Sequence, residues 1–161
     1  MTRKPAEIPL SDPSTRIVGR TAGVIVVGID GSPSSWDAFD WAVGESTRLH
    51  ADLIAVHVQQ ALDPFVAIGA PFAYVESKEA ADLVAEELYN DARRRAHELG
   101  VKITLIAGSG DTAVLLAQVA QSLKADLIVV GKSTKILHHL GGSIGRRLIF
   151  SQNAPAIVVV P

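Results

Sequence analysis

Five short apolar runs rich in β-branched residues constrain the fold of this chain more than any other feature of its sequence. They cover residues 24–29, 52–58, 101–106, 126–130 and 156–160. The first run, VIVVGI, has no alternating polar residues, which is typical of a strand buried on both faces of a parallel sheet. Segments with helical spacing separate the runs. This alternation predicts an α/β protein with a doubly wound sheet of five parallel strands and helices on both faces.

The third run differs from the others because polar residues interrupt it at alternate positions. Lys102 and Thr104 are the interrupting residues, and they indicate an edge strand with one wetter face. The glycine-rich stretch 108–111 should then form a turn. Its last residue, Asp111, is suited to cap the following helix.

Length and composition fit one domain, which we place at residues 23–161. The chain has 161 residues, of which 48% are hydrophobic, enough for a single core. We expect residues 1–22 to be a disordered tail, because they carry three prolines and no apolar stretch long enough for a signal peptide. No run is long enough to cross a bilayer. We therefore expect a cytoplasmic protein without a membrane role.

Charge and cysteine content narrow the possible functions. The formal net charge is −2, so no general basic field attracts nucleic acid or an anionic membrane. The chain has no cysteine, which excludes disulfides, thiol catalysis and cysteine-bound metals. Any site for an anionic ligand must therefore be local.

The segment after the second run is long and apolar for a loop in a compact domain. Residues 59–74 include two prolines and a glycine, and we expect them to cover a ligand or a partner chain, or to form a surface loop packed on the next helix. Residues 76–99 should be that helix, with acids early and bases late, as the helix dipole favours. Its three adjacent arginines are expected to lie on a solvated face. Gly100 should end it. The expected buried stripe consists of Ala81, Val84, Leu88, Ala92, Ala96 and Leu99.

Residues 126–147 combine the fourth run with a basic, glycine-containing loop. No Asp or Glu follows Asp126, and the loop reaches Gly142 and Ser143 before a helical pattern starts at Ile144. Glycines let backbone N–H groups approach a phosphate, and a helix N-terminus favours negative charge. The segment therefore predicts an anionic ligand.

The first and fourth strands end in residues that suit a nucleotide. Asp30 follows the first strand and Gly131 the fourth. If these strands are neighbours, a carboxylate for ribose hydroxyls and N–H donors for phosphates face one cleft at the carboxyl ends of the strands. An Asx-turn before Ser32 explains Asp30 nearly as well, with Ser32 as the N-cap of a helix that starts at Pro33.

Other site motifs are incomplete. Residues 126–133 imitate a phosphate-binding P-loop but lack its first glycine, and their interior belongs to a strand. The adjacent His138 and His139 are badly spaced to bind one metal ion. We expect His57, inside the second strand, to be packed and hydrogen-bonded near the cleft rather than to act as a general base.

An ordered set of segments resembles one known family. The segments are 26–32, 56–58, 125–131, 142–143 and 155–160. They look like a universal stress protein domain over residues 23–161. That family has a five-stranded Rossmann-like α/β fold with strand order 3-2-1-4-5, often dimerises through its last strand, and includes ATP-binding and non-binding members. The resemblance implies the same fold here and a homodimer formed through Ala156–Val160.

The resemblance also implies a site for ATP or a related adenine nucleotide, with or without Mg²⁺. The implied residues are Asp30, Val58 and Val130 at the ribose and base, and Gly131, Gly142, Ser143 and Ile144 at the ribose and phosphates. The binding members share a loop written G-x2-G-x9-G-S/T. This chain departs from it twice: Thr134 replaces the second glycine, and the segment before Gly142 is two residues shorter.

Three functions remain in view. The first is a regulatory, nucleotide-binding protein of the stress response, and the second is a non-binding dimeric interaction protein of the same family. The third is an adenylyl-transferring enzyme, but the S-G-G-x-D-S signature of those enzymes is missing. We rank them in this order and expect at most slow ATP hydrolysis, because no general base or metal-binding carboxylate cluster stands beside the phosphate loop.

Overall fold

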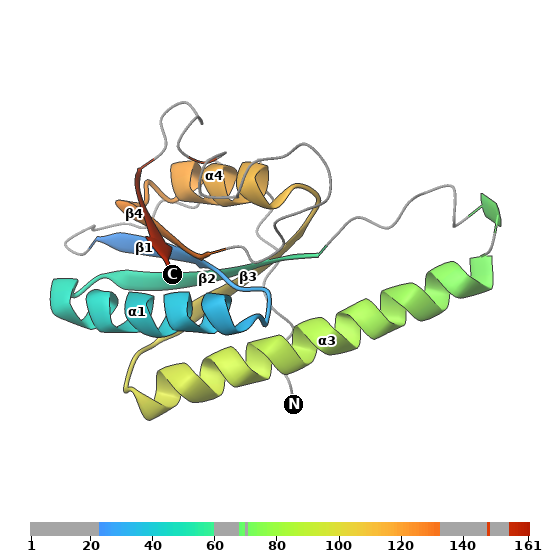
Figure 1. Cartoon of the computed structure of the whole chain (residues 1–161), viewed down its shortest axis with the longest axis horizontal. Coiled ribbons are helices and arrows are strands. Elements are labelled where there is room, and N and C mark those ends of the chain that lie inside the picture. Colours follow the sequence, from blue (N-terminus) through green and yellow to red (C-terminus); the bar gives the residue numbers. More distant parts are fainter. Residues whose placement is uncertain (1–22, 60–67, 70, 133–147, 149–154) are drawn as a thin grey trace.

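The computed structural model describes residues 23–59, 68–69, 71–132, 148 and 155–161, and contains one five-stranded parallel sheet (Figure 1). The strands lie in the order β3-β2-β1-β4-β5 and pair in parallel throughout. Their bounds are β1 Val24–Gly28, β2 Asp52–Gln59, β3 Ile103–Ser109, β4 Leu127–Gly131 and β5 Ala156–Val160. The predicted fold class, strand order and edge position of the third strand are confirmed.

Among the described residues, three helices longer than one turn cover the two faces of the sheet (Figure 1). Their bounds are α1 Pro33–Leu49, α3 Pro71–Glu98 and α4 Thr112–Ser122. Helices α1 and α3 share one core cluster with the sheet, and α4 packs into a second cluster on the opposite face. Successive residues of β1 alternate between the clusters, since Val24 and Val26 belong to the second and Ile25 and Val27 to the first.

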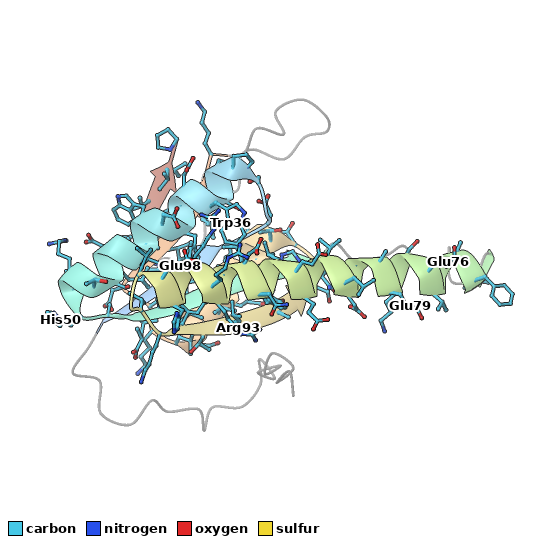
Figure 2. All side chains as sticks on the ribbon, turned by 90° about the horizontal axis from the view of Figure 1, so that it is seen from below. Trp36, His50, Glu76, Glu79, Arg93 and Glu98 are labelled. Atoms are coloured by element: carbon cyan, nitrogen blue, oxygen red, sulfur yellow. The ribbon has the colours of Figure 1, made fainter. Side chains whose placement is uncertain are left out.

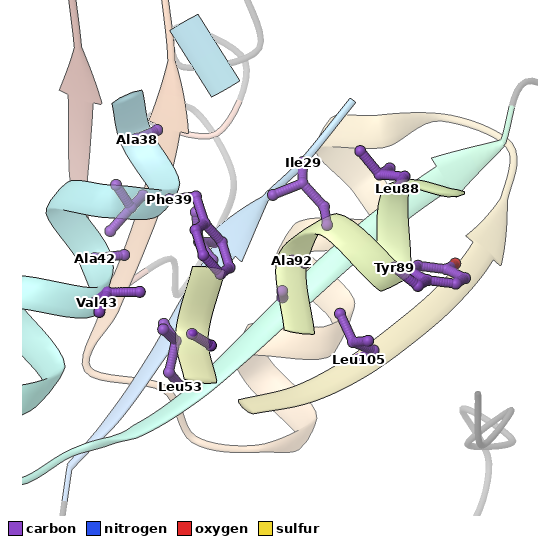
Figure 3. Packing of buried hydrophobic residues seen from close by; sticks show 14 of the residues in the cluster. Ile29, Ala38, Phe39, Ala42, Val43, Leu53, Leu88, Tyr89, Ala92 and Leu105 are labelled. Atoms are coloured by element: carbon purple, nitrogen blue, oxygen red, sulfur yellow. The ribbon is translucent and has the colours of Figure 1, made fainter. Parts of the chain in front are cut away.

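The first cluster is filled mainly by side chains of α1 and α3, which pack on the strands of the sheet (Figure 3). Phe39 of α1 is completely buried and lies near Ile29 and Leu53, while Ala92 and Tyr89 of α3 stand over the sheet beside Leu105. Burying an aromatic or leucine side chain of this kind stabilises the fold by about 1.5–3 kcal/mol. This cluster therefore holds α1 and the second half of α3 in place.

The expected helix caps at two N-termini are confirmed. The Ser32 hydroxyl accepts a hydrogen bond from Ser35 N at 3.2 Å, and Pro33 is the first residue of α1. The Asp111 carboxylate accepts from Val114 N at 3.1 Å at the start of α4. These caps satisfy backbone donors that the helix itself cannot pair.

The third strand is longer than its apolar run predicts. Pairing with β2 continues through Val58 with Gly108 and Gln59 with Ser109, so the predicted turn at 108–111 is wrong for its first two residues. Gly108 is not a turn residue; a Cβ there would overlap the Leu115 side chain. The turn falls instead at Gly110, whose φ of +114° requires glycine.

The predictions for the segment between β2 and β3 are also corrected. Gln59 belongs to β2, and α3 begins at Pro71 rather than at residue 76, so the expected loop 59–74 is too long at both ends. Residues 60–67 and 70 lie outside the described residues, so what the segment covers remains a prediction. The helix ends at Glu98, followed by Gly100 at a φ of +69°, as expected.

The buried stripe of α3 is shifted from the predicted one. The buried residues are Ala85, Leu88, Tyr89, Ala92 and Ala96. Val84 and Leu99, which we had placed in the stripe, are 61% and 56% exposed. Three alanines, Ala85, Ala92 and Ala96, make the close approach to the sheet, and neither Val84 nor Leu99 does.

The N-terminal tail and the absence of a membrane span were both predicted. The tail 1–22 lies outside the described residues, so its disorder stays a prediction. Within the part of the chain that the structure describes, no helix is long and apolar enough to cross a bilayer.

Candidate functional site

The carboxyl ends of β1 and β4 lie side by side at the centre of the sheet. The two strands pair through Ile25 with Leu127 and Val27 with Val129. On one side of this pair the chain order runs to β2 and β3, and on the other side to β5. The strand order therefore reverses between β1 and β4, which is where ligands of open α/β sheets bind. The expectation that these strands are neighbours is confirmed.

Asp30 lies just beyond the end of β1 and is exposed. Its Oδ1 accepts a hydrogen bond from Ser32 N at 2.9 Å, which is an Asx-turn, and Ser35 Oγ lies 3.3 Å from Asp30 N, which donates to it. Gly31 between them has a φ of +81°, a conformation that glycine adopts without strain. The alternative interpretation of Asp30 as a turn residue is thus confirmed, and the same turn holds its carboxylate at the carboxyl edge of the sheet.

Gly131 has a packing reason to be glycine. A Cβ at this position would overlap the Ser34 carbonyl and stand 2.7 Å from Ser35 N, in the first turn of α1. The end of β4 therefore lies directly against the N-terminus of α1. The next residue, Lys132, donates its N–H to Val160 O at 2.7 Å and so keeps β5 paired at this edge. Sequence reasoning assigned Gly131 to ligand approach and missed this contact.

Val58 and Val130 form an apolar wall on the α4 side of the same edge. Val130 belongs to the second core cluster and Val58 packs against it. Gly28, between them in the sheet, would place a Cβ 3.2 Å from Leu116 Cδ1 and 3.6 Å from Val130 Cγ1. Gly28 was not among the predicted site residues, yet it lets α4 come close to the strand ends. Its sequence signal was present in the glycine that interrupts the first apolar run.

His57 and Tyr89 lie on the opposite, α3 side of the edge. His57 Nδ1 is 3.0 Å from Ile29 O, so Nδ1 carries a proton that it donates to this carbonyl. The two rings meet edge to face, with centroids 6.0 Å apart and an interplanar angle of 80°. The expectation of a packed, hydrogen-bonded histidine near the cleft is confirmed.

The Tyr89 hydroxyl is buried without a hydrogen-bond partner among the described residues. Burial raises the pKa of Tyr89 to about 12, and the nearby Arg93 charge opposes the shift. A phenol in this environment stays neutral throughout the physiological range. Sequence reasoning missed Tyr89 because it did not belong to the predicted stripe.

A contact between α1 and α3 lies beside the first turn of α1. The guanidinium of Arg95 stands 4.5 Å from the centroid of the Trp36 ring and pairs with Asp40 at 3.2 Å. Trp36 in turn meets Phe39 edge to face. Arg95 is thus only partly solvated, with 35% of its side chain exposed, because one side of it packs on α1. No local pattern could reveal this contact, since Asp40 and Arg95 are 55 positions apart.

The remaining predicted site residues lie outside the described residues. They are Gly142, Ser143, Ile144 and Thr134, together with His138 and His139. The structure thus brings together Asp30, Val58, Val130 and Gly131 from three segments of the chain, at the ends of β1, β2 and β4, and the phosphate side of the predicted site stays a prediction. Within the described ranges, no group of three or more His, Cys, Asp or Glu side chains could hold a metal ion.

Comparisons with known proteins agree with this architecture. The model of the universal stress protein family matches residues 22–160. A universal stress protein of Methanocaldococcus jannaschii is 31% identical over 137 residues, which is 84% of this chain and 80% of the relative. A universal stress protein of Mycobacterium tuberculosis is 31% identical over 83% of this chain but is aligned over only 43% of its own length, so this chain spans less than half of that longer relative.

A solved structure has the same fold. The crystal structure of a universal stress protein in complex with cAMP is 25% identical to this chain, with a TM-score of 0.64 over 87% of this chain and 97% of that protein. The family model covers nearly all of the sheet and helices described above, and the strand order agrees with the order that the sequence resemblance implied. The chain therefore belongs to the universal stress protein family.

Proposed function

We propose that this protein binds ATP or a related adenine nucleotide at the carboxyl edge between β1 and β4, and acts as a regulator in the stress response rather than as a catalyst. The observation that carries the proposal is the placement of the Asp30 turn and the end of β4 side by side where the strand order reverses. Open α/β sheets bind nucleotides at this point.

The described side chains and backbone suit the nucleoside half of such a ligand. The exposed Asp30 carboxylate can accept hydrogen bonds from ribose hydroxyls while Ser32 N holds it in the turn. Val58 and Val130 offer an apolar wall for a base on the α4 side. In this proposal the backbone of Gly131, Gly142, Ser143 and Ile144 receives the phosphates, and Mg²⁺ accompanies a polyphosphate ligand.

Relatives with bound ligands support the ligand class. One universal stress protein structure is described as a complex with cAMP, an Arabidopsis thaliana member as having AMP bound, and an Archaeoglobus fulgidus member as a complex with dAMP. All three ligands share adenine, a sugar and one phosphate. Of this shared part, the adenine and the sugar are what the described edge is suited to hold.

A regulatory role fits the geometry of Asp30. Its carboxylate accepts a hydrogen bond from the backbone of Ser32, which gives it a place in a turn and a fixed orientation toward a ligand rather than the part of a general base. A ligand that touches both the β1 turn and the end of β4 also touches the N-terminus of α1, because Gly131 lies against Ser34 and Ser35. Binding can therefore alter the position of α1.

The second candidate function is a dimeric interaction protein that binds no nucleotide. The observation that favours it is β5, which ends the sheet and pairs only with β4 among the described strands. Val159 on this strand is 48% exposed. An edge of this kind can pair with a second copy, so we propose a homodimer formed through Ala156–Val160. Light scattering that shows a monomer at micromolar concentration would contradict it.

Titration calorimetry of the nucleotide-stripped protein distinguishes the two functions. We expect saturable binding of ATP, AMP or cAMP by the wild-type chain, measured with and without Mg²⁺. Asp30→Asn keeps an oxygen for the Asx-turn but removes the charge, and should weaken binding about tenfold if the carboxylate holds the ribose. Gly142→Val should abolish binding of phosphate-bearing ligands and leave the fold intact.

Matched controls separate loss of the site from loss of the fold. Asp111→Asn makes the same change at the cap of α4, which follows the edge strand β3 rather than β1 or β4, and should leave the affinity unchanged. Absence of binding heat and of thermal stabilisation with every nucleotide would overturn the nucleotide proposal and leave the dimeric interaction protein.

A further inference from the structure

The first half of α3 extends beyond the sheet (Figures 1 and 2). Gln59, the last residue of β2, donates through Nε2 to Ala81 O and to Asp82 Oδ1, at 3.4 Å each, which marks the level at which the strand ends. Because α3 starts at Pro71, ten residues of helix precede this level. They extend roughly 15 Å past the strand at 1.5 Å per residue. We call residues 71–84 of α3 the arm.

The arm carries large apolar side chains in solvent. Phe72 is 87% exposed, Leu83 65%, and Val75 and Val84 are also more than half exposed. With about 100° per residue, Phe72, Val75 and Leu83 fall within about 80° of one another around the helix axis. The centre of this stripe is about 130° away from the centre of the buried stripe of Ala85 to Ala96 on the same helix. The apolar stripe of the arm therefore faces away from the core.

Acidic residues lie on the same face of the helix as this stripe, between its apolar side chains and beside them. Glu76, Glu79 and Glu86 project from the same side of the helix as Leu83, at the positions that helical spacing assigns to them. The arm's single base, Lys78, lies about 100° around the helix axis from the centre of this face. Among the described residues none of the three glutamates forms an ion pair; the ion pairs of α3 involve Asp91, Arg94 and Arg95 at its other end. Figure 2 shows Glu76 and Glu79 far from the body of the molecule.

A helix exposed on all sides is only marginally stable at the length of the arm. Exposed apolar side chains rimmed by charge mark interaction surfaces in soluble proteins. The charge selects the class of partner. Anionic membranes and nucleic acids would be repelled, and in two copies of the arm packed face to face glutamates would oppose glutamates.

We propose that the arm is a docking site for a basic amphipathic helix of another protein. Apolar side chains of the partner would pack on Phe72, Val75 and Leu83, and its lysines or arginines would pair with the glutamates on the same face, as in other helix-to-helix recognition. Helix α3 runs antiparallel to β2, so the arm lies on the carboxyl side of the sheet. The proposed nucleotide site lies on the same side. The proposal does not depend on that site.

The test uses the full-length protein and a fluorescent synthetic peptide. The peptide has about 21 residues, with leucine at the a and d positions of three heptads and lysine and alanine elsewhere. We expect saturable binding by fluorescence anisotropy, weakened by added salt. Two control peptides replace every lysine by glutamate, or scramble the order of the basic peptide, and neither should bind.

Three variants assign the binding to the arm. Phe72→Ser with Leu83→Ser should weaken binding of the basic peptide at least about tenfold, since each removes a buried apolar contact. Leu99→Ser alters a leucine of similar exposure on the far end of the helix and should change nothing. Glu76→Lys with Glu79→Lys should reverse the preference, so that the acidic peptide binds and the basic one does not.

Other results would overturn the proposal. The first is equal affinity of the wild-type protein for all three peptides. The second is a loss of affinity in Leu99→Ser as large as that in Phe72→Ser with Leu83→Ser. The third is no binding of the basic peptide by a protein whose helix content, measured by circular dichroism, includes the arm. Light scattering is run in parallel. Self-association that Phe72→Ser with Leu83→Ser removes would assign the face to a second copy of the chain and exclude the basic partner.

Discussion

The two halves of α3 differ sharply, although one continuous helix contains both. The second half packs Leu88, Tyr89 and Ala92 against the sheet, whereas the first half exposes Phe72 and Leu83 to solvent (Figures 2 and 3). Only the second half is held by the Arg95 contacts to α1. The difference teaches that the length of α3 is not set by the extent of its buried stripe. The second half packs in the core, and the first half presents apolar side chains to solvent.

The largest effect should come from the same substitution made in each half. Leu88→Ala removes a buried side chain and leaves a cavity, so we expect the free energy of unfolding to fall by about 3 kcal/mol. Leu83→Ala removes an exposed side chain and should change it by less than about 0.5 kcal/mol. Urea unfolding followed by circular dichroism measures both. Equal losses would show that the arm is packed in solution.

Tyr89 tests the buried half through its hydroxyl. The folded-state pKa of about 12 lies above the unfolded value near 10. The folded state therefore holds the proton more tightly, and stability that is fully present below pH 10 is lost as the pH rises towards 12. We expect wild-type protein to lose about 2 kcal/mol more than Tyr89→Phe over this range. Urea unfolding of both proteins at a series of alkaline pH values measures this loss. Because the lysines are the same in both proteins, their effect cancels in the difference.

The same variant also tests the unpaired hydroxyl at neutral pH. Tyr89→Phe removes a buried polar group that has no partner among the described residues, so we expect the free energy of unfolding to rise by about 1 kcal/mol. A fall of similar size would mean that the hydroxyl has a partner in solution.

The smallest effect should come from the link between α1 and α3. Arg95→Lys keeps the charge but loses the planar group over Trp36, and we expect a loss of about 0.5 kcal/mol. A double-mutant cycle with Trp36→Leu isolates the pair. Arg94→Lys is the matched control, because Arg94 pairs only with Asp91 of its own helix at the surface. A coupling energy of zero would show that the contact between Arg95 and Trp36 does not stabilise the second half of α3.

Much of the candidate site could be predicted from the sequence because its residues are set by local rules. The Asx-turn of Asp30 and the cap of Ser32 require residues two or three positions away. The packing of Gly131 on Ser34 could not be predicted, because it joins residues 97 positions apart. The sequence also does not distinguish a glycine that makes room for a helix from one that makes room for a phosphate.

The sequence by itself determined the number and type of the strands, because buried parallel strands need apolar runs and the helices between them need a 3.6-residue period. Their order in the sheet was implied by the family resemblance and not by these patterns. Tertiary structure alone decided how far β3 extends, which stripe of α3 is buried, and where Arg95 and Tyr89 lie. Pairing with β2 carries β3 on to Ser109 through a glycine that Leu115 requires. These features depend on contacts between distant segments, and periodicity along one segment does not contain that information.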